Sequence, residues 1–187
     1  MRSLLEPSVL VLLALLLLGG GEPGTSEIRA GSAPRLGVQA LTEHADLVLE
    51  GRVLRTTSTR RHGRIETDAL IACDRTHVGE NRSNRWITLP GGVLPNGDGM
   101  LLAGVPSLAE GERVMLFLSE SNAAGVRMPV GLSQGKWYVH EDALGNRWVA
   151  PTRSSGVSFV GEGQDARVHA YAEFLAKIEV GRHARRR

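Results

Sequence analysis

The stretch ADLVLEGRVLRTTST, residues 45–59, decides how this chain folds. It is rich in β-branched and apolar residues, which favour a strand, and it contains one interior glycine, Gly51. A glycine inside a strand marks a bulge or a sharp bend, and small barrels use such bends to coil a strand. The turn RRHG at residues 60–63 ends the run. We therefore expect residues 45–59 to form a long, coiled strand.

The residues after this turn alternate between apolar and polar at the period of a half-buried strand. One face carries Ile65, Thr67, Ala69, Ile71 and Cys73, and the other carries Glu66, Asp68 and Asp74. The two runs together predict a long hairpin.

Further strands and two helices are predicted on either side of this hairpin. Strand-like runs are RWITLP (85–90), VMLFL (114–118), VRMPVG (126–131), KWYVH (136–140) and RWVAP (147–151). Helical spacing of apolar residues predicts a short helix that begins at Val38 and an amphipathic C-terminal helix over 164–180, with Val168, Tyr171, Leu175 and Ile178 on its apolar face. The pattern predicts a mainly β (α+β) fold, a small antiparallel β-barrel with a helix at each end.

The ends of the chain carry signals of their own. Residues 1–21, with the apolar run Val9 to Leu18, are typical of a signal peptide cleaved between residues 21 and 33. We expect a flexible mature N-terminus over 22–37, a single domain over 38–180 and a basic, disordered tail over 181–187. A secreted or periplasmic location follows, with no integral membrane segment after signal removal.

A long excursion rich in glycine and proline, GGVLPNGDGMLLAGVP, occupies residues 91–106. Loops of this length are usually functional or loosely ordered. Asp98 is the only carboxylate within it, so NGDG (96–99) predicts a turn and not a calcium loop.

The charge pattern argues against a nucleic-acid partner. The formal net charge is only +2, and the hairpin segment 45–77 has no aromatic residue on which a base could stack. Acidic residues also interleave the arginines of this segment. The hairpin is therefore predicted to present a solvated, ion-paired face, with anionic polysaccharide binding as the alternative.

Cysteine and histidine usage predicts neither a metal nor a cofactor. Cys73 is the only cysteine, so no internal disulfide can form, and Cys73 with His77 would supply at most half of a metal site. No CxxC, HxH or HExxH spacing is present. We therefore interpret Cys73 as a small buried side chain on the inner face of the hairpin.

The stretch GLSQG at residues 131–135 matches the G-x-S-x-G pattern of a nucleophile elbow around Ser133. An elbow requires a helix directly after the serine, whereas KWYVH is typical of a strand, and His140 follows after only seven residues. We expect two glycines that permit a turn or bulge between strands. A small serine hydrolase that uses Ser133 remains the alternative, and no other catalytic residue is predicted.

The runs ADLVLEGRV (45–53), GG (91–92) and GVPSLAEGERVMLFL (104–118) resemble a set of uncharacterised secreted bacterial proteins. The helix-then-strand opening is also similar to the oligonucleotide/oligosaccharide-binding (OB) type barrel of the tissue inhibitors of metalloproteinases and netrin modules, over about residues 38–151. This resemblance implies an OB-like barrel. Those inhibitors use an N-terminal cysteine and bracing disulfides, which this chain lacks, so their mechanism transfers to no residue here.

These observations predict a secreted or periplasmic, non-enzymatic binding or interaction module. The excursion and the rim of the barrel are the expected contact surface, since loops on a rigid scaffold usually carry recognition. The expected partner is a protein or an extracellular ligand, and the resemblance leaves a modulator of an exported protease as an alternative.

Overall fold

The computed structural model describes residues 31–153, 156–160 and 167–186. The predicted signal peptide lies outside these residues. The elements in chain order are β1 (Gly31–Pro34), α2 (Val38–His44), β2 (Leu47–Arg61), β3 (Arg64–Val78), β4 (Asn84–Pro90), β5 (Gly92–Val93), β6 (Gly99–Met100), β7 (Arg113–Leu118), the 3-10 turn η1 (Leu132–Gly135), β8 (Lys136–Glu141), β9 (Arg147–Pro151), β10 (Val157–Val160), β11 (His169–Ala170) and α3 (Tyr171–Ala184).

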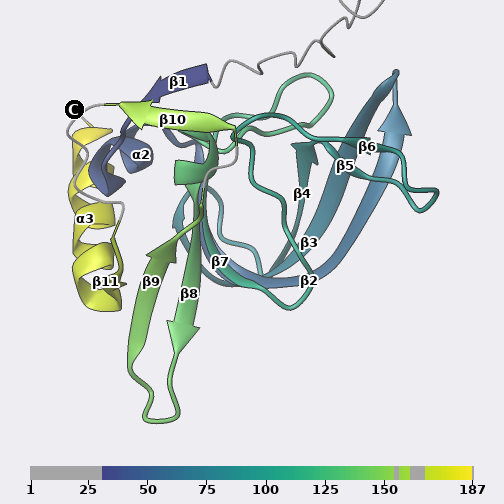
Figure 1. Ribbon diagram of the computed structural model, residues 1–187. Helices are drawn as coiled ribbons and strands as arrows, with labels where there is room; N and C mark the ends of the chain where they lie inside the picture. Colours follow the sequence, from purple (N-terminus) through teal and green to yellow (C-terminus); the bar gives the residue numbers. More distant parts are fainter. Residues whose placement is uncertain (1–30, 154–155, 161–166, 187) are drawn as a thin grey trace, which may run out of the picture.

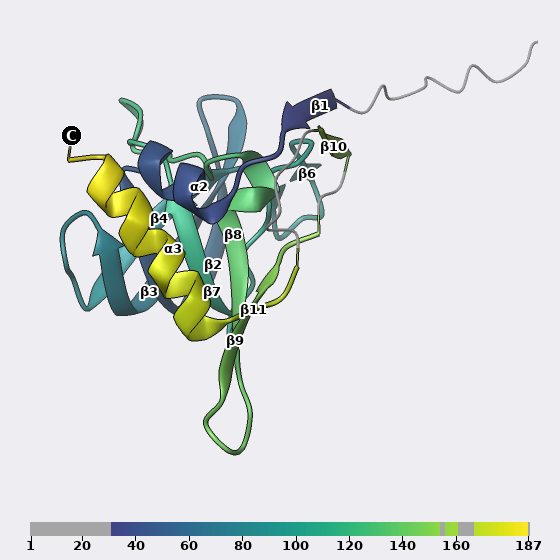
Figure 2. The same cartoon turned by 90° about the vertical axis from the view of Figure 1, so that its left-hand side faces the viewer.

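The core of the fold is one antiparallel sheet of seven strands, in the order β11-β9-β8-β7-β2-β3-β4. The predicted long hairpin is confirmed as β2 and β3, which are the longest strands and curve strongly in Figure 1. The hairpin of β8 and β9 projects away from the rest of the sheet (Figures 1 and 2).

The sheet is not the closed barrel that the sequence predicts. Within the described residues no continuous ladder joins β4 back to the far side of the sheet, and β4 and β11 are its edges. The reason lies in β7, which pairs with β2 along one side and with β8 along the other. Strands that a small barrel would use for closure instead extend the sheet outward through β9 and β11.

Gly51 produces the predicted irregularity in β2. The pairing of β2 with β3 shifts register at three points, one of them between Glu50 and Gly51. A Cβ at Gly51 would lie only 2.2 Å from the carbonyl oxygen of Ala72 in β3. The two strands can therefore approach this closely only where the side chain is a hydrogen.

Two groups of buried side chains form the core, one on each face of the sheet. Leu49, Ile71 and Leu116 represent the group enclosed by the curved strands β2, β3, β4 and β7. On the other face Phe117 and Trp137 pack against Phe174 of α3, with ring centroids 6.2 and 4.7 Å apart. Figure 2 shows α2 and α3 lying together over this second face.

The C-terminal helix differs in its bounds from the predicted 164–180. Residues 169–170 pair with β9 as β11, so α3 begins only at Tyr171. It then continues to Ala184, and residues 181–184 are helical where a disordered tail is predicted. At Gly181 an added Cβ would lie 2.7 Å from the carbonyl oxygen of Gln39, so this glycine lets α3 approach α2 closely.

Two other predictions change with these contacts. Val168, predicted to face the core, precedes the helix and is exposed, whereas Phe174 is fully buried. Residues 31–34, predicted to be flexible, form β1, which pairs in parallel with β10.

A buried charge cluster joins the sheet to α3. The carboxylate of Glu50 in β2 is 1% exposed and accepts hydrogen bonds from Arg147 of β9 and from the hydroxyl of Tyr171 in α3. The Arg147 guanidinium also stacks over the Tyr171 ring at 3.8 Å. Burial and the bond to Glu50 raise the pKa of Tyr171. Arg147 and Tyr171 thus satisfy the Glu50 carboxylate, which would otherwise be costly to bury.

Candidate functional site

The glycine- and proline-rich excursion leaves the sheet after β4 and folds back over the distal end of the hairpin. Its entry is fixed by the amide of Gly91, which donates to the carbonyl oxygen of Ile65 at 2.8 Å. Gly91 and Gly92 have φ values of +90° and +140°, and a Cβ at Gly92 would lie 2.2 Å from the hydroxyl oxygen of Thr67. Only glycine fits this conformation and this close approach.

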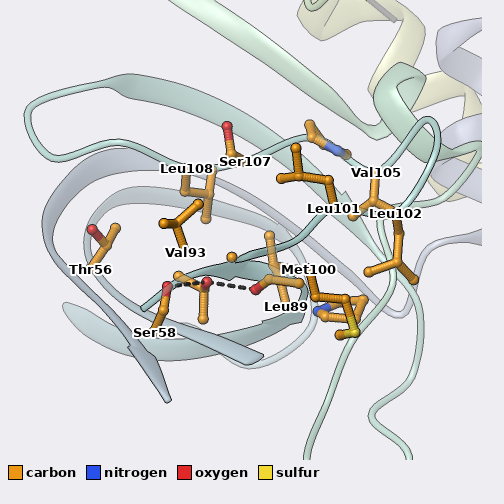
Figure 3. Close-up of a pocket in the computed structure, with 15 residues that line it drawn as sticks. Thr56, Ser58, Leu89, Val93, Met100, Leu101, Leu102, Val105, Ser107 and Leu108 are labelled. Atoms are coloured by element: carbon orange, nitrogen blue, oxygen red, sulfur yellow. Dashed lines mark hydrogen bonds between the residues drawn. The ribbon is translucent and has the colours of Figure 1, made fainter. Parts of the chain in front are cut away.

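Between the excursion and the hairpin lies a hollow of about 240 Å³, which we call the excursion hollow (Figure 3). It is lined by Thr56, Ser58, Thr67, Leu89, Pro90, Gly91, Gly92, Val93, Met100, Leu101, Leu102, Val105, Pro106, Ser107 and Leu108. Most of these side chains are apolar, so the hollow favours an apolar occupant.

The polar side of the excursion hollow is internally bonded. The hydroxyls of Ser58 and Thr67 lie 2.9 Å apart, and Thr67 donates to the carbonyl oxygen of Gly91 at 2.7 Å, as the dashed lines in Figure 3 show. These groups hold the hairpin and the excursion together and leave the apolar surface as the part available to a ligand.

The rim of the excursion hollow carries large apolar side chains that face solvent. Val93 is 57% exposed and Leu101 is 84% exposed, with Leu102 beside them. Neighbouring exposed apolar side chains around a hollow mark an interaction surface more often than scattered ones do. The structure therefore places an apolar surface where the sequence predicts the contact loop.

A second hollow of about 580 Å³ adjoins the first along residues 101–107, and we call it the lysine hollow. Its lining residues are Leu101, Leu102, Gly104, Val105, Pro106, Ser107, Ser133, Lys136, Tyr138, Pro151, Thr152 and Arg153. Sequence analysis did not predict this hollow. The available signal was Lys136, one of only two lysines, three residues after Ser133.

Ser133 lies in the lysine hollow, within the 3-10 turn η1, and β8 follows it directly. Gly131 and Leu132 before it both adopt left-handed backbone conformations, with φ of 64° and 61°. The side chain is 2% exposed, and its hydroxyl has no hydrogen-bond partner among the described residues. The prediction of a turn followed by a strand is confirmed, and no described base is bonded to this hydroxyl.

Lys136 is fully buried, and its ammonium group is engaged elsewhere. It donates to Glu112 at 2.7 Å, to the carbonyl oxygen of Ser107 at 2.8 Å and to the hydroxyl of Tyr138 at 3.4 Å. An ammonium held by a carboxylate is a poor proton acceptor. Lys136 is therefore unsuited to activate Ser133.

Cys73 and His77 do not form a site in the structure. Cys73 is only partly buried, its thiol donates to the carbonyl oxygen of Ile71 at 3.7 Å, and burial raises its pKa, which opposes thiolate formation. Burial lowers the pKa of His77. No group of three or more His, Cys, Asp or Glu side chains in the described part of the chain could hold a metal ion.

The predicted ion-paired face of the first hairpin forms only in part. Arg61 binds the carboxylates of Glu66 and Asp68, and Arg60 pairs with Asp98 in the excursion at 3.3 Å. The Arg61 hydrogen bond lowers the pKa of Asp68, which also accepts a hydrogen bond from Thr88. Among the described residues the other four arginines of β2 and β3 form no ion pair: Arg52, Arg55, Arg64 and Arg75.

Comparison with known proteins gives no further guide, because no family model, no curated protein and no solved structure matches the chain. None of the helices in the described ranges is both long enough and apolar enough to cross a membrane.

Proposed function

We propose that this protein is a non-enzymatic binding module, secreted or periplasmic, whose excursion hollow receives one large apolar side chain of a partner protein. The observation that carries the proposal is the size and chemistry of this hollow. A volume of about 240 Å³ is smaller than the roughly 300–1,000 Å³ of typical small-molecule sites. It suits a single buried anchor residue of the kind that dominates protein interfaces.

The surroundings of the hollow support a protein partner. Val93 and Leu101 extend the apolar surface beyond the cavity, so an anchored partner would cover them and gain further burial. The glycines and the Ser58–Thr67–Gly91 contacts hold the hollow open in the unbound protein. A preformed hollow lowers the cost of ordering on binding.

We also propose an OB-like arrangement for the central strands. Residues 126–130 run between β4 and β7, with a parallel bridge from Thr88 to Val126 and an antiparallel bridge from Leu118 to Pro129. The amide of Arg127 donates to Thr88 and the amide of Val130 donates to Phe117, both at 2.9 Å. With this segment as a short fifth strand, β2, β3, β4 and β7 resemble a partly open five-stranded barrel.

The binding proposal is tested by selecting partners from a displayed library of random dodecapeptides. We expect selected peptides to share one large apolar residue and to bind with an affinity that Val93→Asp weakens at least about tenfold, because a charge at the rim would have to be desolvated. Leu144→Asp is the matched control, since Leu144 is 88% exposed at the tip of the projecting β8–β9 hairpin. Equal loss in both variants, or selected peptides without an apolar anchor, would contradict the proposal.

The hydrolase alternative is tested by labelling with a fluorophosphonate. We expect no labelling of Ser133, because its hydroxyl is buried and no base among the described residues is bonded to it. Labelling that Ser133→Ala abolishes would replace the binding proposal with an enzymatic one.

The protease-modulator alternative is tested by adding the protein to a panel of exported metalloproteases, whose rates we expect to stay unchanged.

A further inference from the structure

The lysine hollow has the size of a small-molecule site. Its volume of about 580 Å³ lies within the range of about 300–1,000 Å³ found for such sites. It is formed by three separate parts of the chain: residues 101–107 of the excursion, the η1–β8 junction, and the end of β9 with the two residues after it. It adjoins the excursion hollow, with which it shares Leu101, Leu102, Val105, Pro106 and Ser107, whereas its lining from η1, β8 and residues 151–153 belongs to it alone.

The charge of its lining is positive. Lys136 and Arg153 both line it, and none of the described lining residues carries a carboxylate. Glu112, which pairs with Lys136, is not among the lining residues. Arg153 makes no ion pair within the described residues. The Glu112 carboxylate, 2.7 Å from the Lys136 ammonium, balances the charge of that lysine, so Arg153 is the cation in the lining that no described carboxylate pairs.

Two hydroxyls in the lining are buried without a hydrogen-bond partner in the described part of the chain, those of Ser133 and Thr152. Buried hydroxyls are normally satisfied, so a pair of them beside one cavity indicates an acceptor that belongs there. The hydroxyl of Tyr138 accepts from Lys136 and keeps its own hydrogen available to donate. Tyr138 thus offers an O–H donor to the cavity, and the hydroxyls of Ser133 and Thr152 lie buried in its wall.

The remaining lining is apolar. Leu102, Val105 and Pro106 from the excursion and Pro151 from β9 contribute hydrocarbon surface. A fitting ligand therefore combines a negatively charged acceptor group with a hydrocarbon body. A carboxylate supplies both the negative charge and the acceptor oxygens.

We propose that the lysine hollow binds a small organic acid, whose carboxylate accepts hydrogen bonds from Ser133 and Thr152 beside the cation of Arg153, and whose hydrocarbon part packs on Leu102 and Val105. This assigns to Ser133 a binding role in place of the nucleophilic role that its sequence motif indicates. Val93, on the rim of the excursion hollow, does not line this site.

The test uses the full mature chain and two-dimensional amide NMR with a set of monocarboxylic acids from butyrate to phenylpropionate, each paired with its primary amide. We expect at least one acid to shift the amide signals of Gly104, Ser133 and Thr152 saturably. The matching primary amide should bind at least about tenfold more weakly, and added salt should weaken the acid.

Three variants separate the proposal from a merely structural cavity. Ser133→Ala removes an unbonded hydroxyl, so the fold should persist while affinity for the acid falls about tenfold. Arg153→Gln should weaken binding about threefold, and the control Arg167→Gln, which changes an exposed arginine paired with Glu173, should leave it unchanged.

Absence of saturable shifts with every acid, equal binding of acids and amides, or unaltered affinity in a folded Ser133→Ala variant would overturn the proposal. Its failure is distinguishable from failure of the partner-binding proposal, because Val93→Asp should leave acid binding intact and Ser133→Ala should leave peptide binding intact.

Discussion

Glu50 is the residue whose environment differs most from what its type would indicate. Its carboxylate is almost completely buried and is shared between Arg147 and Tyr171. Sequence alone could not have revealed this, because the partners come from β9 and α3, 97 and 121 residues further along the chain. The same applies to Lys136, whose partner Glu112 is 24 residues away.

Replacement of Glu50 by glutamine should therefore be costly. Glu50→Gln removes the negative charge while Arg147 stays partly buried, and we expect a loss of about 2–3 kcal/mol in the free energy of unfolding. Urea unfolding followed by circular dichroism measures the loss. Glu141→Gln, which changes an exposed partner of the same arginine, should cost less than about 1 kcal/mol. Similar losses in both variants would contradict this account.

Asp68 gives a prediction about acid stability. Its pKa is lowered from 3.8 by the hydrogen bond from Arg61, so the folded state favours the charged carboxylate. This contribution is fully present above pH about 4 and is lost as the pH falls through the folded-state pKa. Asp68→Asn should therefore cost about 1 kcal/mol at pH 7 and progressively less toward pH 3.

Urea unfolding of both proteins between pH 3 and pH 7 measures this convergence. Glu120→Gln, at an exposed carboxylate, serves as the control. A difference between Asp68→Asn and the parent that stays constant or grows on acidification would contradict the assignment.

At the scale of elements, the hairpin of β2 and β3 was predictable and the path of the sheet was not. Alternation of apolar residues identifies a strand, and Gly51 identifies its bulge, because both are local properties of the chain. Which strand pairs with each side of β7 depends on contacts between distant segments, and in this fold the pairing leaves the sheet open. The C-terminal helix was misplaced because residues 169–170 pair with β9 although their sequence fits a helix equally well.

Gly51 supplies the prediction at this scale. Gly51→Ala would place a Cβ 2.2 Å from a backbone oxygen of β3, so β2 and β3 must separate at the bulge, and we expect a loss of about 3 kcal/mol or more. Gly99→Ala in β6 is the control, since its Cβ would lie in ordinary contact with a Val93 methyl carbon at 3.5 Å and the Gly92 carbonyl oxygen at 3.7 Å. Chemical unfolding measures both variants, and a Gly51→Ala variant as stable as Gly99→Ala would show that the strands can shift freely.

At the scale of the whole molecule, the two faces of the sheet share one set of strands and should unfold together. Neighbouring residues of β7 face opposite groups, with Phe117 on the helix side and Leu116 inside the curved strands. Loss of either group removes packing from the same backbone.

The two hollows, in contrast, arise where the excursion crosses the sheet, and no pattern in residues 91–108 reports how a loop will lie on a distant surface. The sequence could therefore indicate the long excursion but could reveal neither hollow.

Phe174 tests the coupling between the two faces. Phe174→Ala leaves a cavity against Phe117 and Trp137, and we expect a loss of about 3–5 kcal/mol. Tryptophan fluorescence, to which Trp137 contributes together with Trp86 and Trp148, and far-ultraviolet circular dichroism, which reports on the whole sheet, should give the same lowered midpoint. Two separate transitions in the variant would show that the helix side unfolds independently.

The pairing of β1 with β10 has a kinetic consequence. The adjoining contact, between Arg35 and Phe159, joins residues 124 positions apart. Strand β1 can therefore pair only after β10 has been synthesised. While the chain emerges from the ribosome, residues 31–35 have no strand to join, and their docking follows the closure of nearly the entire polypeptide. Pairing over such separations slows folding to milliseconds or longer, which leaves the N-terminal segment accessible to other proteins throughout synthesis.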